Sequence, residues 1–155
     1  AQSITAAERL AKEPDADIAR IFSSDLLRAA QTARIISDRL SVPVAYLPQL
    51  REVNNGVLAG MANERADMEY PGLYWRTLDF DEHYPGGESP HEFYDRISAA
   101  WGDLVTSVRG SGKDAALVTH GGVINVIMHI VDGVHYSNQT PSFCIGNAEY
   151  TAVEV

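Results

Sequence analysis

Apolar residues recur three and four positions apart in four segments of the chain, a spacing typical of amphipathic helices. These segments are residues 3–12, 25–40, 90–109 and 122–131. In 25–40 the apolar positions include Leu27, Ala30, Ile35 and Ile36. In 90–109 they form one stripe, which predicts a helix with a single face in the core. That stripe consists of Phe93, Ile97, Ala100, Trp101, Leu104, Val105 and Val108.

Short apolar runs alternate with these helices and predict strands. They are "ARIFSS" (19–24), "PVAYLPQL" (43–50), "AALVTH" (115–120) and the alternating "NAEYTAVEV" (147–155). The run at 115–120 is almost continuously apolar, which is typical of a strand covered on both faces. Strands that alternate with helices predict an α/β protein, here a three-layer sandwich with a mostly parallel central sheet.

In residues 51–90 the apolar positions follow neither the helical spacing nor the alternation of a strand, and the segment ends in the turn cluster "YPGGESP". This composition predicts an excursion of loops and short helices, and we expect it to be part of one domain that spans residues 1–155. The excursion contains five aromatic residues that either line a ligand pocket or pack among themselves. They are Tyr70, Tyr74, Trp75, Phe80 and Tyr84.

Composition limits the partners of the protein. With 155 residues, 45% of them apolar, the chain is long enough to bury a core. A net charge of -9 argues against nucleic acid and anionic membranes as partners. The acidic residues concentrate at 64–95, which predicts a solvated face or, alternatively, a site for a cationic ligand. The single cysteine, Cys144, predicts a buried thiol, and together with the absence of any membrane-length apolar run it favours a cytoplasmic protein.

The first candidate for chemistry is His120, at the end of the run 115–120. Ligands of open α/β sheets bind at the carboxyl ends of the strands. Gly121 and Gly122 follow, so backbone amides at the start of a helix would favour an anion there. We expect the His120 ring to face solvent; the alternative is a structural histidine that is buried and bonded to the backbone.

The second candidate is Arg28, just after the predicted strand 19–24. Ser24 or Asp25 is expected to cap the following helix, and Arg28 in its first turn is placed to reach back towards the strand end. Its guanidinium offers paired donors that match phosphate oxygens. The alternative is that Arg28 only pairs with the acidic Asp25.

The third candidate is Glu52, in a loop rich in Asn and Gly. A carboxyl group beside a bound phosphate is kept protonated by the nearby negative charge, and it can then donate a proton to a leaving oxygen. The alternative is an exposed glutamate paired with Arg51.

Several motifs, in this order along the chain, resemble the histidine phosphatase superfamily, the phosphoglycerate mutase-like proteins. They are "SSDLLRAAQTA", "LREVNNGVLAG", "PGGES", "VTHGGVINVIM" and "NAEYTAVEV". The resemblance covers essentially the whole chain and implies a phosphoglycerate mutase-like fold, phosphoryl transfer through a phosphohistidine, a small phosphorylated substrate, and no metal or other cofactor. It also implies that Arg28 and His120, with Gly121, bind the phosphate and that Glu52 donates and accepts the proton.

The chain departs from the family at one point. Family members open with a strand that ends in Arg-His-Gly, which supplies the nucleophilic histidine, and this tripeptide is absent here. The remaining histidines, His83, His91, His129 and His135, lack the setting for a substitute. Because loss of a strand from the middle of the sheet would leave backbone groups unpaired, we expect that strand and the nucleophile upstream of residue 1.

The resemblance leaves three functions open. A short chain with an open pocket lets water take the phosphoryl group, so a phosphatase is favoured over a phosphoglycerate mutase. The missing Arg-His-Gly keeps a third possibility, a phosphate-binding or interaction module without catalysis. A serine hydrolase that uses His120 is disfavoured, because the sequence has no Gly-x-Ser-x-Gly elbow.

Overall fold

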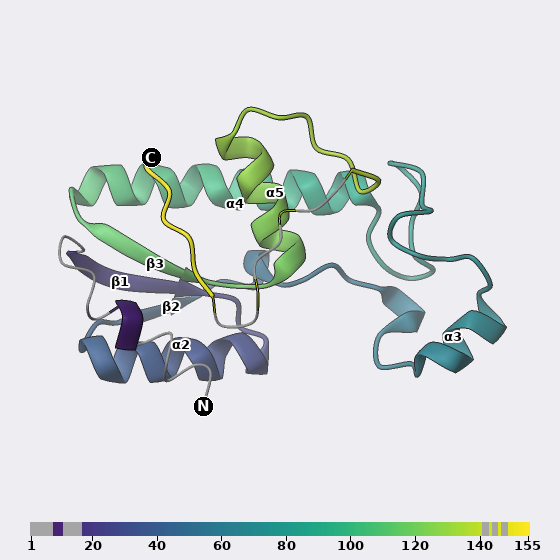
Figure 1. Cartoon of the computed structure of the whole chain (residues 1–155), viewed down its shortest axis with the longest axis horizontal. Coiled ribbons are helices and arrows are strands. Elements are labelled where there is room, and N and C mark those ends of the chain that lie inside the picture. The colour runs from purple at the N-terminus through teal and green to yellow at the C-terminus, as the bar shows by residue number, and fades with distance from the viewer. Residues whose placement is uncertain (1–7, 11–16, 141–142, 144–145, 147–148) are drawn as a thin grey trace.

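Three parallel strands form the sheet of the computed structural model, which describes residues 8–10, 17–140, 143, 146 and 149–155. They are β1 (Ile18–Ser23), β2 (Val44–Tyr46) and β3 (Asp114–Val118), in the order β2-β1-β3 (Figure 1). All three predicted runs in this part of the chain contain a strand. β2 is shorter than expected because Pro48 starts a 3-10 turn, η1 (Pro48–Leu50).

Helices cover both faces of this sheet. α2 (Leu27–Leu40) lies on one face, and α4 (Pro90–Ser111) and α5 (Gly121–Val131) lie on the other (Figure 1). Adjacent residues of β1 point to opposite sides, so Ile21 packs with Ala33 of α2, whereas Phe22 packs with Phe93 of α4. These layers confirm the predicted α/β fold with a parallel sheet.

α4 is the helix that the sequence pattern predicts best. The Ser89 hydroxyl accepts a hydrogen bond from the Glu92 amide (3.1 Å), and the Glu92 carboxylate accepts one from the Ser89 amide (3.3 Å). This capping box starts the helix, and Gly112 ends it in the left-handed conformation (φ 63°). Four positions of the predicted stripe are buried: Phe93, Ile97, Ala100 and Leu104.

α2 begins differently from the prediction. Its N-cap is Leu26, which makes no side-chain cap, so neither Ser24 nor Asp25 caps it. Asp25 is unavailable because its carboxylate binds Arg51, and the Ser24 hydroxyl accepts from the Leu26 amide, before the helix starts. The buried face is made of Ala29, Ala33 and Ile36, whereas Leu27 is 73% exposed.

The two ends of the chain test the prediction only in part. Residues 8–10 are helical, and the rest of the predicted helix 3–12 lies outside the described residues. Cys144 and residues 147–148 also lie outside them. Residues 149–155 are not a strand, so that prediction is wrong for the part of the segment the structure describes. An alternating pattern suits an extended chain, but a strand also needs a neighbour to share ladder hydrogen bonds, and the described sheet consists of β1, β2 and β3 alone.

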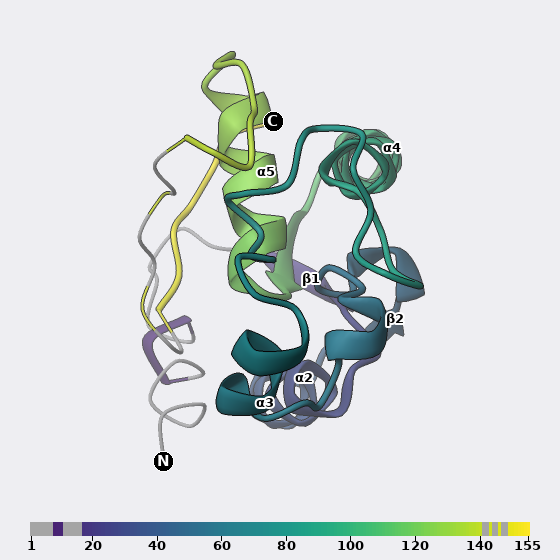
Figure 2. The ribbon, with the colours of Figure 1, turned by 90° about the vertical axis from the view of Figure 1, so that its right-hand side faces the viewer.

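The excursion of residues 51–89 projects from one end of the sheet (Figure 1). As predicted, it contains only short helices, η2 (Gly56–Leu58) and α3 (Asn63–Glu69), with loops between them (Figure 2). Three of its five aromatics pack: Trp75 and Phe80 contact the core, and buried Tyr84 stacks on Trp75 with ring centroids 6.1 Å apart. Tyr74 is exposed.

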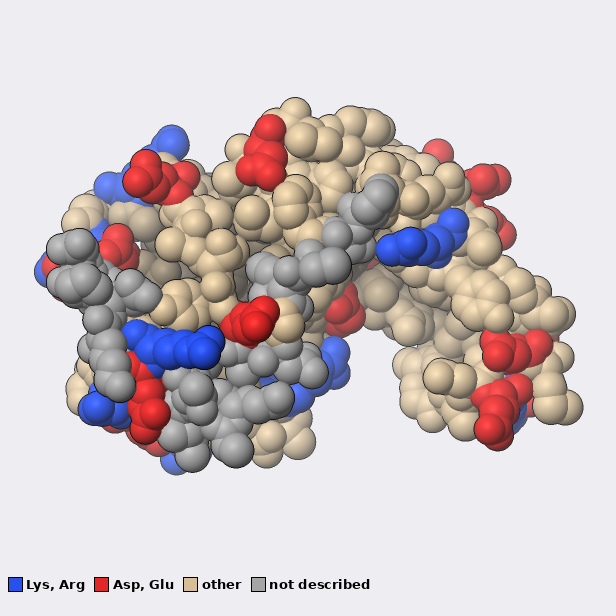
Figure 3. Space-filling model, viewed as in Figure 1, with Lys and Arg blue, Asp and Glu red and all other residues tan. Residues whose placement is uncertain are grey.

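Most acidic side chains of the segment 64–95 lie in solvent, in agreement with the solvated-face prediction. All of them except Glu88 are exposed, and Figure 3 shows acidic groups at the outer end of the excursion.

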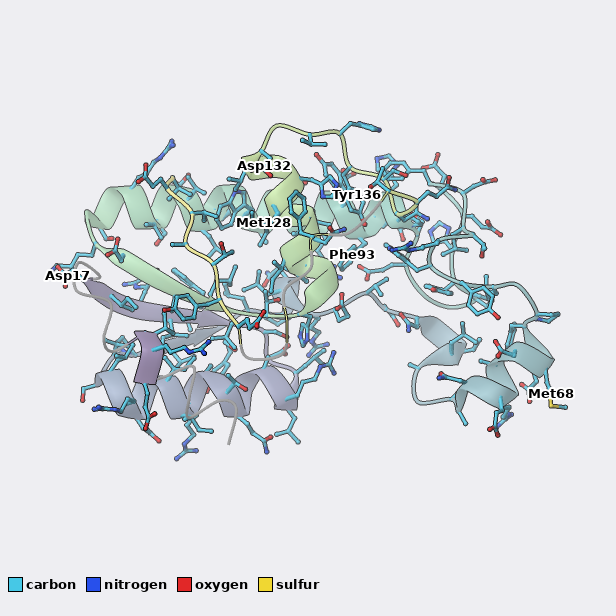
Figure 4. All side chains as sticks on the ribbon, viewed as in Figure 1. Asp17, Met68, Phe93, Met128, Asp132 and Tyr136 are labelled. Atoms are coloured by element: carbon cyan, nitrogen blue, oxygen red, sulfur yellow. The ribbon has the colours of Figure 1, made fainter. Side chains whose placement is uncertain are left out.

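Met68, on α3, points away from the body of the molecule and is 83% exposed (Figure 4). In the part of the chain that the structure describes, no helix has the length and apolar character to cross a membrane.

Candidate functional site

The ends of the strands are joined at one edge of the sheet. The Ser24 amide, just after β1, donates to the Val118 carbonyl at the end of β3 (3.0 Å). The Thr119 hydroxyl donates to the Leu50 carbonyl (2.8 Å), which ties the end of β3 to η1. The segments that carry Arg28, Glu52 and His120 therefore start from neighbouring points.

His120 is the N-cap of α5 and is only 7% exposed. Its Nδ1 accepts a hydrogen bond from Arg28 Nε (3.2 Å), and its Nε2 lies 2.8 Å from the Ser24 hydroxyl. Because Nδ1 is an acceptor, the neutral ring carries its proton on Nε2 and donates it to Ser24. The expected solvent-facing ring is wrong: the imidazole turns inward, between the start of α2 and the end of β1.

The environment of His120 favours its neutral form. Burial lowers the pKa of His120 below its usual value, and the Arg28 cation lowers it further, whereas the Glu52 carboxylate acts in the opposite direction. His120 is thus an uncharged acceptor towards Arg28 at neutral pH.

Glu52 reaches the start of α5 from the loop after η1. Its Oε2 accepts a hydrogen bond from the Gly122 amide (3.1 Å), and its Oε1 accepts one from the Val53 amide (3.1 Å). A Cβ atom on Gly122 would lie 2.4 Å from Glu52 Oε1, so the absence of a side chain at Gly122 leaves room for the carboxylate in this position. The alternative pairing with Arg51 is not formed.

Arg51 pairs instead with Asp25. Its Nε and Nη2 lie 2.6 and 2.5 Å from the two oxygens of that carboxylate. The hydrogen bonds from Arg51 hold the pKa of Asp25 below its usual value. Since Asp25 is occupied, Arg28 has no ion pair with it and is directed to His120.

Arg28 and the start of α5 supply positive charge to the site. Arg28 is exposed, and its hydrogen bond to His120 uses Nε, so within the part of the chain that the structure describes its two terminal nitrogens are not engaged in a hydrogen bond. Gly121 is the first residue of α5 and is exposed as well. A guanidinium and a helix N-terminus next to a single carboxylate form a setting in which a phosphate can be bound and a proton moved.

The sequence interpretation did not find the role of Ser24 as the partner of His120. Ser24 was expected only as a helix cap, and the two residues are 96 positions apart. Its one signal in the sequence is that Ser24 is the last residue of the predicted strand 19–24. The link depends on β1 and β3 being neighbours in the sheet.

The other histidines lie elsewhere. His91 pairs with Asp81 (2.8 Å) at the start of α4, and His83 pairs with Glu92 (3.0 Å). His129 is buried in α5, where its Nδ1 donates to the Asn125 carbonyl (2.7 Å). Among the described residues, no group of three or more His, Cys, Asp or Glu side chains is arranged to hold a metal ion.

The sequence of the chain is similar to one protein family and to several named proteins. The family model described as "Histidine phosphatase superfamily (branch 1)" matches residues 1–155. A glucosyl-3-phosphoglycerate phosphatase of Mycolicibacterium vanbaalenii is 36% identical, over 96% of this chain and 68% of that protein. Phosphoglycerate mutase-like protein 4 of Arabidopsis thaliana is also 36% identical, over 79% of this chain and 54% of its own length.

A solved structure has the same fold. The mycobacterial glucosyl-3-phosphoglycerate phosphatase in complex with VO3 superimposes with a TM-score of 0.77 and 30% sequence identity. The match covers 95% of this chain and 72% of that one. The chain thus spans about two thirds of its phosphatase relative and about half of the plant protein.

Proposed function

The chain belongs to the histidine phosphatase superfamily, and from this premise we propose that the full-length protein hydrolyses small phosphomonoesters. The observation that supports the proposal most strongly is the meeting of Arg28, Glu52 and His120 beside the N-terminus of α5. Hydrolysis of a phosphomonoester requires that the phosphate anion be bound and that a proton be moved, and these residues are suited to both tasks.

In the proposed mechanism Arg28 and the Gly121 amide bind the phosphoryl oxygens. The guanidinium swings from His120 Nδ1 to the anion, and Nδ1 then takes up a proton and donates a hydrogen bond to a phosphoryl oxygen. This exchange follows from the contact in the free protein, where Nδ1 has no hydrogen to offer.

The bond that breaks joins phosphorus to the ester oxygen. The phosphoryl group passes to the nitrogen of the nucleophilic histidine expected upstream of residue 1, and Glu52 gives its proton to the departing oxygen. Glu52 then takes a proton from water as that water attacks the phosphohistidine, which releases inorganic phosphate. No metal takes part in these proposed steps.

The substrate proposed first is a phosphorylated glycerate that carries a sugar, because a relative of which the chain covers 68% bears the name glucosyl-3-phosphoglycerate phosphatase. Mutase activity is the second candidate, because other relatives are named phosphoglycerate mutase-like or probable phosphoglycerate mutase. A cytoplasmic location stays a prediction, supported by the single cysteine of the chain.

The test is a phosphate-release assay on the full-length protein with p-nitrophenyl phosphate, glucosyl-3-phosphoglycerate and 3-phosphoglycerate. We expect release of inorganic phosphate that persists in EDTA. Activity that disappears with EDTA and returns with a divalent cation would contradict the phosphohistidine mechanism. Isomerisation of 3-phosphoglycerate without phosphate release would establish the mutase, and tight phosphate binding without turnover would indicate a binding module.

A further inference from the structure

One ion pair lies next to the loop that carries Glu52. Arg96 of α4 binds Glu88 of the preceding turn through two parallel hydrogen bonds, from Nε to Oε1 (2.7 Å) and from Nη2 to Oε2 (2.8 Å). Their side chains are only 23% and 18% exposed. A bidentate pair sheltered from water has a defined geometry, unlike a surface ion pair between flexible side chains.

Arg96 also holds the backbone before Glu52. Its Nη1 donates to the carbonyl of Gln49 (2.6 Å) and to the carbonyl of Arg51 (3.1 Å). The second of these carbonyls belongs to the peptide bond that leads directly into Glu52. Arg96 thereby fixes the position from which the Glu52 side chain starts.

Glu88 holds the backbone after Glu52. Its Oε2 accepts from the Asn54 amide (2.8 Å), and its own amide donates to the Asn54 carbonyl (2.9 Å). The two segments of chain approach so closely that a Cβ atom on Gly87 would lie 2.2 Å from the Asn54 carbonyl oxygen. The loop is therefore held on both sides of Glu52 by the two members of one ion pair.

The shape of the guanidinium is essential to this arrangement. Nε, Nη1 and Nη2 of Arg96 each donate a hydrogen bond, and the guanidinium carbon lies 5.2 Å from the centre of the Phe93 ring. A lysine has one ammonium group and reaches a carboxylate as a point charge, so it cannot hold the carboxylate and two carbonyls in a plane.

We propose that Arg96 and Glu88 are positioning residues for Glu52. By holding residues 49–54 from α4 and from the turn before it, they direct the Glu52 carboxylate to the Gly122 amide, where it lies beside His120. Neither residue is proposed to touch the substrate. The inference rests on the proposed function, in which Glu52 protonates the leaving oxygen.

Substitution of Arg96 by lysine separates positioning from a general structural role. A displaced proton donor slows esters whose leaving oxygen needs the proton, such as an alkyl phosphate, but not p-nitrophenyl phosphate, whose leaving group departs as a stable anion. The informative quantity is kcat/KM, which reports on departure of the leaving oxygen and not on the later hydrolysis of the phosphohistidine that both substrates share. For Arg96→Lys in the full-length protein we expect kcat/KM for glycerol phosphate to fall about tenfold or more. We expect kcat/KM for p-nitrophenyl phosphate to change less than about threefold.

The matched control is Arg65→Lys. Arg65 also pairs with a glutamate, Glu69, at 2.6 Å, but on the exposed surface of α3, so this variant should match the unmodified protein with both substrates. Glu88→Gln keeps the shape of its side chain and should show the same selective loss, which gives a second measurement if Arg96→Lys fails to fold. Melting temperatures identify the range in which each variant is folded.

Three outcomes distinguish the possibilities. Selective loss with glycerol phosphate in Arg96→Lys or Glu88→Gln supports the positioning role. Suppose that Glu52→Gln is itself selective for glycerol phosphate. Arg96→Lys and Glu88→Gln proteins that then lose activity equally with both substrates, or with neither, overturn the positioning role. If Glu52→Gln lowers kcat/KM equally for both substrates or for neither, the proposed role of Glu52 as proton donor fails, and the positioning inference fails with it.

Discussion

The sheet with its covering helices and the excursion of residues 51–89 are held together by different forces. In the first region, apolar side chains of β1 point alternately to α2 and to α4, and burial of these faces provides the stability. In the excursion the helices are short, and much of the structure depends on polar contacts such as those of Asn138, whose Nδ2 donates to the Trp75 and Leu78 carbonyls (2.6 and 2.9 Å).

The candidate site lies where these two regions meet. Arg28, in the first turn of α2, and His120, the N-cap of α5, lie on helices that follow β1 and β3, whereas Glu52 lies at the start of the excursion. The comparison teaches that hydrophobic burial places Arg28 and His120, whereas hydrogen bonds to the backbone place Glu52. Each of the following predictions tests one part of that contrast.

The largest effect is expected for His120→Ala in the full-length protein. Loss of a donor to the phosphoryl group should lower kcat about 100-fold or more. Because the ring is buried against Ser24, the free energy of unfolding should also fall, by about 1–3 kcal/mol. Activity and chemical denaturation measured on the same preparation test both effects.

His129→Ala is the control, since this second histidine of α5 is buried but lies among aromatic rings, against Tyr136 and Phe143. It should lower the melting temperature and leave kcat of the folded molecules unchanged. A His120→Ala protein with full kcat would contradict the proposed site.

Leu78→Ala should loosen the excursion without loosening the sheet. Leu78 is fully buried, so the change should cost about 2–3 kcal/mol, at the lower end of the usual range because a loop region can collapse around the cavity. Hydrogen exchange should become faster at residues 56–86 and remain slow in β1 and β3. The comparison variant Ile97→Ala, in the core of α4, should speed exchange in both regions. Equal acceleration in Leu78→Ala would show that the two regions unfold as one unit.

Gly122→Ala should displace Glu52, the proposed proton donor. The added Cβ would lie 2.4 Å from Glu52 Oε1, so the carboxylate must move, and kcat for an alkyl phosphate should fall about tenfold. Gly102→Ala adds the same methyl group on α4, where nothing lies within 4 Å, and should only stabilise the helix, by about 0.5–1 kcal/mol. An unchanged kcat in Gly122→Ala would argue against the role of Glu52.

The smallest effect is a pH dependence of anion binding, a few-fold in affinity. The pKa of His120 is lowered in the free protein, and an anion that draws Arg28 away should raise it. Between these two pKa values the complex holds an extra proton, so sulfate should bind more tightly as the pH falls. Calorimetry in two buffers with different ionisation enthalpies measures that proton uptake.

Without a bound anion, the free energy of unfolding should decrease as the pH falls. Because the pKa of His120 is depressed in the folded state, its contribution is fully present above the unfolded pKa of about 6.5 and is lost as the pH falls through the folded value. His91 is a second histidine with a shifted pKa, raised chiefly by its hydrogen bond to Asp81, so His91→Gln is the control and should leave sulfate binding unchanged. Sulfate affinity that does not vary with pH would contradict the proton uptake at His120.

The sequence by itself determined the elements whose signals are local. The apolar stripe of residues 90–109 predicted α4, the apolar runs predicted β1 and β3, and the missing periodicity of 51–90 predicted the excursion. Placement of Arg28 and His120 at strand ends followed from the same patterns, because parallel strands all present their carboxyl ends at one edge.

Only the tertiary structure decided which polar groups meet. Arg28 and His120 are 92 residues apart, and the choice of Arg51 rather than Arg28 as the partner of Asp25 depends on the position of the loop after η1. Hydrophobic periodicity reports which face of an element is buried, but a hydrogen bond depends on the distance between two side chains from different elements. The buried position of the His120 ring and the ion pair of Arg96 with Glu88 therefore depend on how the sheet and helices pack, and only the tertiary structure shows them.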